Sequence, residues 1–411
     1  MSLKNKNVLI TGITGFVGSH LAKELIARGA NVFGLARRRA DGSRPRNLVG
    51  NGVYDRVRLI QGDITDSASI GLCLSQSKPD VIFHLAAQSF VPASFINPLE
   101  SLVTNAIGTA NLLEVIRLQG LNSVVVFAGS SEEYGLAFTS QKHYELAMER
   151  YGNAFPKPER FPELPINEYN SLRPVSPYAV SKVHADYLVR SYHSIYGLKT
   201  IVSRAFNHEG AGRGIMFVTA AITNQVMKLK LGESDRIVVG NVNTFRDWSH
   251  VSDIVEGYCI LAEKGRYGDI YVLGSMRTNS VLSYILLSLQ KAGWEVRRIE
   301  SMKNGRTVEN PMEKDCFPMF GISFEKTKVD RAMLEEGLEF TLEDKGIWVD
   351  TDRGRVPIVF DQDRYRRADV PILLSDPAKA KGVGFKVSHT LEDIIEDQLN
   401  YFMSKENRSL G

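Results

Sequence analysis

Residues 7–29 read NVLITGITGFVGSHLAKELIARG, and this stretch decides the fold. Its apolar start predicts a buried β-strand, and the amphipathic pattern over residues 16–29 predicts a helix that ends at glycine. Gly12, Gly15 and Gly18 lie between them, where glycine permits a tight turn and lets a helix N-terminus approach a pyrophosphate closely. The order of strand, glycines and helix therefore predicts a dinucleotide-binding site, and an ordinary glycine turn is the alternative.

The first half of the chain alternates short apolar strands with helical patterns, which is typical of a parallel sheet covered by helices on both faces. We expect further strands at residues 31–36, 57–63, 80–87, 123–129 and 201–206, and helices at residues 67–76 and 100–120. This pattern predicts an α/β fold with a Rossmann-type doubly wound parallel sheet.

Beyond residue 206 the alternation loosens. We expect helices at residues 216–231, 251–264, 281–292 and 328–337, short strands at 236–240 and 270–275, and a polar, proline-containing stretch at 302–321. Residues 1–206 are therefore predicted to be mainly the dinucleotide-binding domain. Residues 207–411 are predicted to be mainly a smaller α/β substrate-binding domain on the carboxyl edge of the sheet. This division leaves room for late elements that return to the sheet.

The composition excludes several classes of protein. Lysine and arginine number 50 against 47 for aspartate and glutamate, and the net charge of +3 is too small to indicate nucleic-acid binding. The three cysteines stand singly and the histidines lack metal-ligand spacing, so we expect a reducing compartment and no metal. The sequence shows no secretory cleavage signature and no run of membrane-spanning length. We therefore expect a cytoplasmic protein with no nucleic-acid and no membrane partner.

The residues after the second predicted strand select the cofactor. NAD sites usually place an acid there, whereas arginine suits the 2′-phosphate of NADP. The chain has Arg37, Arg38 and Arg39 with no acid until Asp41, which favours NADP; a solvated basic loop is the alternative. Asp63 is placed to accept a hydrogen bond from the adenine amine. The predicted cofactor-binding residues are Gly12, Thr14, Gly15, Phe16, Val17, Gly18, Arg37, Arg38, Asp63, Ile64, Leu85, Ala86, Ala87, Tyr178, Lys182 and His208. For His208 the favoured interpretation is a packing or hydrogen-bonding residue.

Two further motifs indicate acid–base chemistry. In SPYAVSK, Tyr178 and Lys182 lie four residues apart at the start of a helix and share one face. A neighbouring ammonium lowers the pKa of a phenol, so the tyrosinate can accept a proton from a sugar hydroxyl. In GSSEEYG, residues 129–135, two serines and two acids directly follow a predicted buried strand. This segment is either an acidic polar turn or the place where a substrate is deprotonated.

The chain resembles the extended short-chain dehydrogenase/reductases, and most of all the GDP-mannose 4,6-dehydratase family. The resemblance is carried, in the family's order, by TGITGFVGSH, ARRR, HLAAQSFVPASF, GSSEEYG, SPYAVSK, FNHE, RDWSHVSD and the late GIWVDTDRGRVPIVFDQDRYRRADVPILLSDPAKAK. It implies a sugar-nucleotide 4,6-dehydratase that converts an NDP-hexose to an NDP-4-keto-6-deoxyhexose by internal hydride transfer through NADP. An NDP-sugar epimerase or a 5,6-dehydratase of the same fold is the alternative, and a non-catalytic NADP-sensing protein is a third interpretation.

The resemblance also assigns roles to residues. It places Ser130 at the C4 oxygen and Glu132 at the C5 hydrogen, whereas epimerases usually carry a small residue at the second position. Tyr178 and Lys182 complete the catalytic set, and Glu133 is expected to point away into solvent. The substrate-binding residues that it implies are Gln88, Ser89, Ser130, Glu132, Tyr178, Asn207, Val218, Arg246, Arg366 and Asp369.

Three departures from the family pattern concern the substrate. Ala220 and Ala221 stand where the family has two basic residues. Residues 136–161 form an insertion that we expect to lead over the sugar pocket, and residues 302–337 have no counterpart. A GDP-sugar is favoured, with a sugar or base that differs from GDP-mannose. The basic loop at residues 37–46 lies between protomers in the family, so we expect a homodimer or homotetramer.

Overall fold

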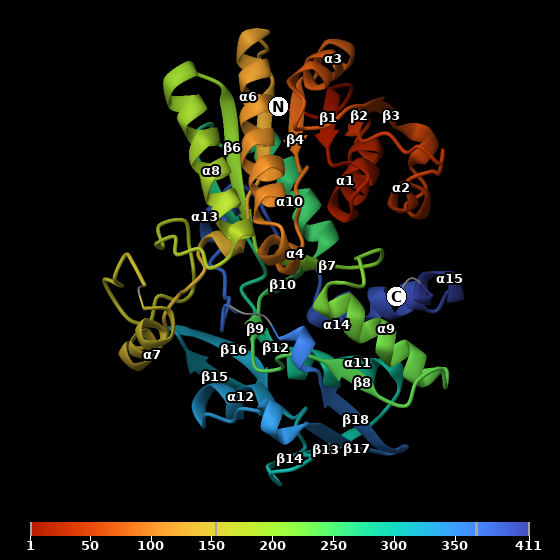
Figure 1. The fold of residues 1–411 in the computed structure, drawn as a ribbon, viewed down its shortest axis with the longest axis vertical. Coiled ribbons are helices and arrows are strands. Elements are labelled where there is room, and N and C mark those ends of the chain that lie inside the picture. Colours follow the sequence, from red (N-terminus) through yellow and green to blue (C-terminus); the bar gives the residue numbers. More distant parts are fainter. Residues whose placement is uncertain (1, 153, 366–368, 410–411) are drawn as a thin grey trace.

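The computed structural model describes residues 2–152, 154–365 and 369–409 (Figure 1). Its larger layer is a seven-stranded parallel sheet in the order β11-β6-β5-β4-β1-β2-β3. The strands are β1 (Asn7–Thr11), β2 (Asn31–Ala36), β3 (Arg58–Gln61), β4 (Val81–His84), β5 (Val124–Ala128), β6 (Lys199–Ala205) and β11 (Ile270–Leu273). The strand order reverses between β1 and β4, which confirms the predicted Rossmann-type doubly wound sheet.

Helices cover both faces of this sheet (Figure 1). One face carries α1 and α10 and the other carries α3, α6 and α8. Val8 and Ile10 of β1 pack in the first of these cores, whereas Leu9 packs in the second. Because both faces of the strand are buried, its sequence is an unbroken apolar run. The helix bounds are α1 (Phe16–Ala27), α3 (Ser67–Ser77), α6 (Gly108–Leu118), α8 (Pro177–Tyr196) and α10 (Val251–Lys264).

A buried histidine ties β1 to β4 where the strand order reverses. His84 Nδ1 lies 2.7 Å from Thr11 Oγ1, and its Nε2 lies 2.9 Å from Thr109 Oγ1. Burial lowers the pKa of His84 to about 3, so a neutral ring bridges the two hydroxyls. Thr11 Oγ1 also accepts from the backbone N–H of Ala86 at 3.2 Å. These contacts fix the carboxyl ends of both strands, where open α/β sheets bind ligands.

The second half of the chain builds a smaller α/β layer beyond the carboxyl edge of the first sheet (Figure 1). Its five-stranded sheet has the order β14-β13-β17-β18-β8 and shares one apolar core with α9, α11 and α14. The bounds are β8 (Ile237–Val239), β13 (Val296–Ser301), β14 (Thr307–Glu309), β17 (Gly346–Thr351), β18 (Gly354–Phe360), α9 (Val218–Lys230), α11 (Val281–Ala292) and α14 (Leu391–Phe402). The predicted smaller α/β layer is therefore present.

Two late segments differ from the simple two-part pattern. β11 and α10 come from the second half of the chain but complete the first sheet and its helical cover. Residues 302–321, predicted as a polar stretch, hold β14 and β15 (Lys314–Met319), and β15 pairs with β16 (Ile322–Thr327) in a hairpin before α12 (Lys328–Glu335). Phe317 lies opposite Phe324 in that hairpin, which gives the polar segment a small apolar face. The domain boundary at residue 206 stays a prediction.

Short elements complete the described chain. They are α2 (Arg46–Gly50), α4 (Val91–Ile96), α5 (Pro98–Ser101), α7 (Gln141–Tyr151), α13 (Ala378–Gly382), α15 (Lys405–Arg408), β7 (Asn207–Glu209), β9 (Phe245–Arg246), β10 (Trp248–His250) and β12 (Asn279–Ser280). Within the part of the chain that the structure describes, no helix is both long enough and apolar enough to cross a membrane.

A buried ion pair fastens the insertion at residues 136–161 to the body of the protein. Arg173 Nη1 donates to Glu163 Oε2 at 2.9 Å, and its Nη2 donates to Glu163 Oε1 at 2.8 Å. The same guanidinium donates to the carbonyl oxygens of Leu136 and Pro156, at the two ends of the insertion. Both charged side chains are buried, so each depends on the other for its counter-charge.

We expect Glu163→Ala to lower the free energy of unfolding by about 3 kcal/mol, because it leaves the Arg173 guanidinium buried without its counter-charge. Thermal unfolding measures this loss, and limited proteolysis locates it, since residues 136–161 should become accessible to the protease. Glu295→Ala removes a solvent-exposed pair with Arg297 and should change the melting temperature far less. Equal effects of the two substitutions would contradict the role of the buried pair.

Candidate active site

A cavity of about 1020 Å³ lies at the carboxyl ends of β1, β4 and β5, between the two layers. The glycine turn after β1, the segment after β4, the turn after β5 and the start of α8 all line it. Every predicted site residue that the structure describes lines this cavity, with the exceptions of Arg38 and Asp369. Arg366 lies outside the described residues. The structure therefore brings the predicted cofactor, substrate and catalytic residues to one space.

The glycine turn presents a helix N-terminus to this cavity. Gly15 caps α1 without a side-chain hydrogen bond, and the first turn of α1 carries no acidic residue. Its N–H groups and the helix dipole therefore favour a bound anion such as a phosphate. Gly12 has a φ of +77°, and a Cβ there would lie 2.8 Å from the backbone nitrogen of Ala86, so glycine is required at this close approach.

The ends of β2 and β3 suit the adenosine part of a dinucleotide with a 2′-phosphate. Arg37 and Asp63 line the cavity there, whereas Arg38 does not. Asp63 accepts from the N–H of Thr65 at 2.9 Å and from its hydroxyl at 2.8 Å, and these bonds with the nearby Arg37 charge hold the pKa of Asp63 below its usual value. Arg46 is a further cation on the cavity wall that the sequence pattern did not single out, although it belongs to the same basic loop.

The phenol and ammonium of SPYAVSK lie at the other end of the cavity. Lys182 Nζ donates to the carbonyl oxygen of Ala128 at 2.7 Å, and burial lowers the pKa of Lys182 to about 8. Ser130 lines the cavity together with Tyr178, and its side chain partly offsets a rise in the Tyr178 pKa. Burial raises the pKa of Tyr178 above its usual value, and neighbouring carboxylates add to this effect. The predicted lowering of the Tyr178 pKa is therefore wrong, because desolvation of the phenolate is the dominant effect.

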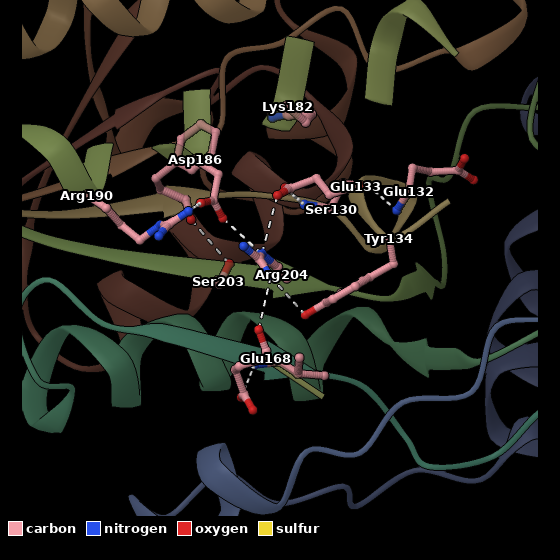
Figure 2. Close-up of polar contacts among 12 residues, drawn as sticks. Ser130, Glu132, Glu133, Tyr134, Glu168, Lys182, Asp186, Arg190, Ser203 and Arg204 are labelled. Atoms are coloured by element: carbon pink, nitrogen blue, oxygen red, sulfur yellow. Dashed lines mark hydrogen bonds and ion pairs between the residues drawn. The ribbon is translucent and has the colours of Figure 1, made fainter. Parts of the chain in front are cut away.

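The two acids of GSSEEYG point in opposite directions (Figure 2). They belong to a 3₁₀ turn, η3 (Ser131–Glu133), in which Ser130 Oγ accepts from the N–H of Glu132 at 3.2 Å and Glu133 Oε1 accepts from the N–H of Ser130 at 2.7 Å. Glu132 lines the cavity. Glu133 is 0% exposed, so the expectation that it points into solvent is wrong. Its carboxylate pairs inside the fold with the buried guanidinium of Arg204, 3.4 Å away.

The substrate end of the cavity is arranged differently from the prediction. Arg246 lines the cavity, and its Nη2 donates to Asp369 Oδ1 at 2.7 Å. Asp369 lines a second cavity of about 730 Å³ and not the first. The predicted base contact by Asp369 is therefore not placed in the first cavity, and this carboxylate instead orients the Arg246 guanidinium.

Neither unmatched segment covers the first cavity. Among the described residues of 136–161 and 302–337, none lines it. Arg150 from the first segment, and Met333 and Gly337 from the second, line the second cavity. The prediction that residues 136–161 lead over the sugar pocket is therefore wrong. The segment is held elsewhere by the buried arginine–glutamate pair described above.

A loop before α9 supplies a cation that the sequence pattern did not single out. Arg213 lines the first cavity, with its Nε 3.3 Å from Glu209 Oε2 and its guanidinium 3.5 Å from the ring centroid of Phe217. Burial and the Arg213 charge lower the pKa of His208 to about 4, so a neutral ring lies beside it. The buried Asn207 Oδ1 has no hydrogen-bond donor among the described residues, and a ligand could supply one.

Known proteins resemble this chain over nearly its whole length. A family model described as GDP-mannose 4,6 dehydratase matches residues 9–398. GDP-mannose 4,6-dehydratases from Sinorhizobium fredii and Vibrio cholerae are 30% and 31% identical, each over 96% of this chain and over 97% and 93% of their own lengths. A GDP-mannose 4,6-dehydratase, sdnI, from Sordaria araneosa is 31% identical over 97% of this chain, which spans 61% of that longer protein.

Solved structures share the fold. RMD from Pseudomonas aeruginosa, complexed with NADPH, has a TM-score of 0.65 at 22% identity, with 97% of this chain and 98% of that chain covered. UDP-glucose 4-epimerase from Bifidobacterium longum, in complex with NAD+ and UDP, has a TM-score of 0.68 at 20% identity, with 98% and 99% covered. At such identities the structures establish the architecture alone. Because the family model matches residues 9–398, the chain belongs to the GDP-mannose 4,6-dehydratase family.

Proposed function

We propose that the protein is an NADP-dependent sugar-nucleotide 4,6-dehydratase that converts a GDP-hexose to a GDP-4-keto-6-deoxyhexose. The observation that carries this proposal is the meeting of Ser130, Glu132, Tyr178 and Lys182 around the cavity that also holds the glycine turn, in a member of this family. The choice of NADP rests on Arg37, since a guanidinium at the end of β2 suits a 2′-phosphate.

The residues of the chain would carry each proton transfer. Tyr178, which lines the cavity with Ser130 and is assisted by the Lys182 ammonium, takes the proton of the C4 hydroxyl as that carbon becomes a ketone. The ketone acidifies the C5 hydrogen, which Glu132 removes and passes to the departing C6 hydroxyl, so that water leaves. C5 regains a proton when hydride reaches C6, and the proton that Tyr178 took from the C4 hydroxyl balances this step. NADP, held by the glycine turn and by Arg37, would supply the redox chemistry, which is the transfer of a hydride from C4 and its return to C6. The oxidation and the reduction cancel, so the net change is the loss of water.

The identity of the nucleotide sugar is the finer part of the proposal. A GDP-sugar is favoured by the shared name of the relatives. Ala220 and Ala221 replace two basic residues of the family, and Arg213 offers a cation on the loop just before them. This rearrangement supports a sugar or base that differs from GDP-mannose. A panel of GDP-, UDP-, CDP- and dTDP-hexoses, followed by mass spectrometry for the loss of water, identifies the substrate.

Other chemistry on the same fold is disfavoured by the position of one acid. Simple epimerisation at the oxidised carbon needs no carboxylate at the neighbouring carbon, whereas Glu132 lines the cavity next to Ser130. A 5,6-dehydratase would use the same acid but leave a C5–C6 double bond, which NMR of the product distinguishes from a C6 methyl group. A non-catalytic NADP sensor would not need the complete set of four residues.

We also propose a homodimer or homotetramer. Exposed apolar side chains gather on α4, α5, the adjoining π-helical turn η2 (Leu102–Ile107) and α8, which contact one another. They include Ile96, Leu99, Ile107, Val180 and Tyr187. A second copy of the chain would cover such a face in a self-complementary interface.

A cytoplasmic location is proposed on the three free cysteines, Cys73, Cys259 and Cys316.

Glu132→Gln is expected to lower the rate of dehydration by about 100-fold or more while NADP binding is unchanged, because the amide cannot accept the C5 proton. Product formation is followed by mass spectrometry and NMR, and NADP binding by fluorescence titration. Glu149→Gln, at an exposed position on α7, is the matched control and should behave as wild type. Undiminished 4-keto-6-deoxy product from Glu132→Gln would refute the role assigned to this acid.

Arg37→Ala is expected to weaken NADP binding by about 10-fold or more with little effect on NAD, because the guanidinium at this position would meet the 2′-phosphate. Arg38→Ala is the matched control, since Arg38 does not line the cavity, and it should leave both affinities near those of wild type. The affinities are measured by isothermal titration at fixed ionic strength. If Arg37→Ala weakened the binding of NADP and NAD equally, or if Arg38→Ala weakened NADP binding more than Arg37→Ala did, the assignment of Arg37 to the 2′-phosphate would be wrong.

Leu99→Asp is expected to shift the protein toward monomer in light scattering after size exclusion, because it buries a carboxylate in the proposed interface. Leu72→Asp, on the exposed face of α3, is the control. A wild-type chain that is monomeric at micromolar concentration would contradict the proposed assembly.

A further inference from the structure

The end of β5 is held by three polar contacts from three different elements. The carbonyl oxygen of Ala128 accepts from Lys182 Nζ of α8 at 2.7 Å. The N–H of Gly129 donates to the carbonyl oxygen of Ser203 of β6 at 2.7 Å. The N–H of Ser130 donates to Glu133 Oε1 at 2.7 Å, within the turn η3 (Figure 2). Each of the three residues Ala128, Gly129 and Ser130 is therefore held by one contact. Together these contacts fix the direction in which the chain leaves the sheet and the position of the Ser130 hydroxyl.

The third contact comes from a side chain that is poorly suited to its surroundings. Glu133 is fully buried, and its Oε2 has no hydrogen-bond donor among the described residues. Arg204 Nε lies 3.4 Å from that oxygen but only 2.9 Å from Asp186 Oδ2, so the guanidinium already has a closer carboxylate. Asp186 in turn also pairs with Arg190 at 2.7 Å. Burial and the Asp186 charge raise the pKa of Glu133 above its usual value.

Stability alone does not account for such a residue. Arg204 would keep its closer contact with Asp186 if Glu133 were absent, and the Oε2 of Glu133 has no hydrogen-bond donor among the described residues to offset the loss of water. The neighbouring backbone is shaped to admit the carboxylate, since a Cβ at Gly129 would lie 2.6 Å from Glu133 Oε1. The carboxylate is thus kept at a cost, next to a residue that touches the reacting groups.

We propose that Glu133 is a positioning residue, whose Oε1 holds the N–H of Ser130 so that the Ser130 side chain is presented to the cavity that Tyr178 also lines. The inference rests on the proposed function, because it assigns Ser130 and Tyr178 to the C4 oxygen. Glu133 touches neither the cavity nor a ligand; it acts through the backbone of Ser130. What matters in this role is an acceptor oxygen at the right reach, and the charge of the carboxylate is secondary.

Three substitutions separate acceptor position from charge. Glu133→Gln keeps an acceptor oxygen at the same reach and removes the charge. Glu133→Asp keeps the charge and withdraws the oxygen by one methylene. Glu133→Met removes both at similar volume. We expect kcat to fall by about 10-fold or more in the Asp and Met variants, with KM changed far less, because misplacement of a catalytic group acts on the chemical step. Glu133→Gln should recover kcat by about 10-fold relative to Glu133→Met.

Other patterns of activity contradict the proposal. If Glu133→Asp is active and Glu133→Gln is not, the carboxylate acts by its charge on Lys182, Arg204 and the other ionisable groups around it. If Glu133→Gln and Glu133→Met lose kcat equally, or if Glu133→Asp and Glu133→Met keep the wild-type kcat, Oε1 does not position Ser130. If Glu133→Met does not fold, the contrast between Glu133→Gln and Glu133→Asp still decides.

Matched controls separate this role from a general loss of structure. Glu163→Gln and Glu163→Met change another buried, arginine-paired glutamate that lies outside the cavity. Both Glu163 variants should lower the melting temperature, and their kcat/KM values should be equal to each other. Dehydration of a nucleotide hexose by the wild-type protein is measured first. If the wild-type protein dehydrates no substrate of the panel, the proposed function is refuted. If the wild-type protein is active and the Glu133 variants have the same kcat, the positioning role alone is refuted.

Discussion

The close approach between the backbone at Gly12 and the backbone at Ala86 sets the geometry around the cavity. No side chain fits between them, so the turn after β1 and the segment after β4 lie together at the point where the strand order reverses. The neutral His84 ring, bridging Thr11 and Thr109, holds the same two strands from beneath. Because this junction is rigid, the α1 N-terminus on one side and the turn after β5 on the other keep fixed positions relative to each other.

Burial acts on the catalytic pair in a way that the spacing in SPYAVSK does not reveal. Burial raises the pKa of Tyr178 and lowers that of Lys182, so it disfavours the charged form of both groups. Lys182 keeps its ammonium in this environment with the help of the Ala128 carbonyl and the Glu133 charge. Proton removal by Tyr178 is therefore governed by the charges brought to the cavity around it, and the Tyr–Lys spacing alone is not sufficient.

Much of the fold follows from the sequence, because both its strands and its glycine turn are set by local patterns. The helices predicted at 251–264 and 281–292 match α10 and α11 residue for residue, since a side-chain N-cap precedes each helix and a glycine follows it. Gly12, Arg37 and Asp63 were predictable because they follow strands whose carboxyl ends share one edge, whereas Ser130, Glu132 and Arg246 were assigned by the family resemblance. The positions of Asp369 and of the insertion at 136–161 were not foreseen, because they depend on partners elsewhere in the chain: Asp369 pairs with Arg246, and Arg173 binds backbone carbonyls of the insertion.

The opposite directions of Glu132 and Glu133 follow from one local structure, the 3₁₀ turn η3. In a 3₁₀ turn successive side chains are about 120° apart, so the direction of one residue determines that of its neighbour. With Glu133 bound to the Ser130 N–H and facing Arg204 in the interior, Glu132 is directed into the cavity (Figure 2). If Glu133 did point into solvent, the same turn would carry Glu132 away from Ser130. The acid assigned to C5 is therefore presented to the cavity by the buried acid beside it.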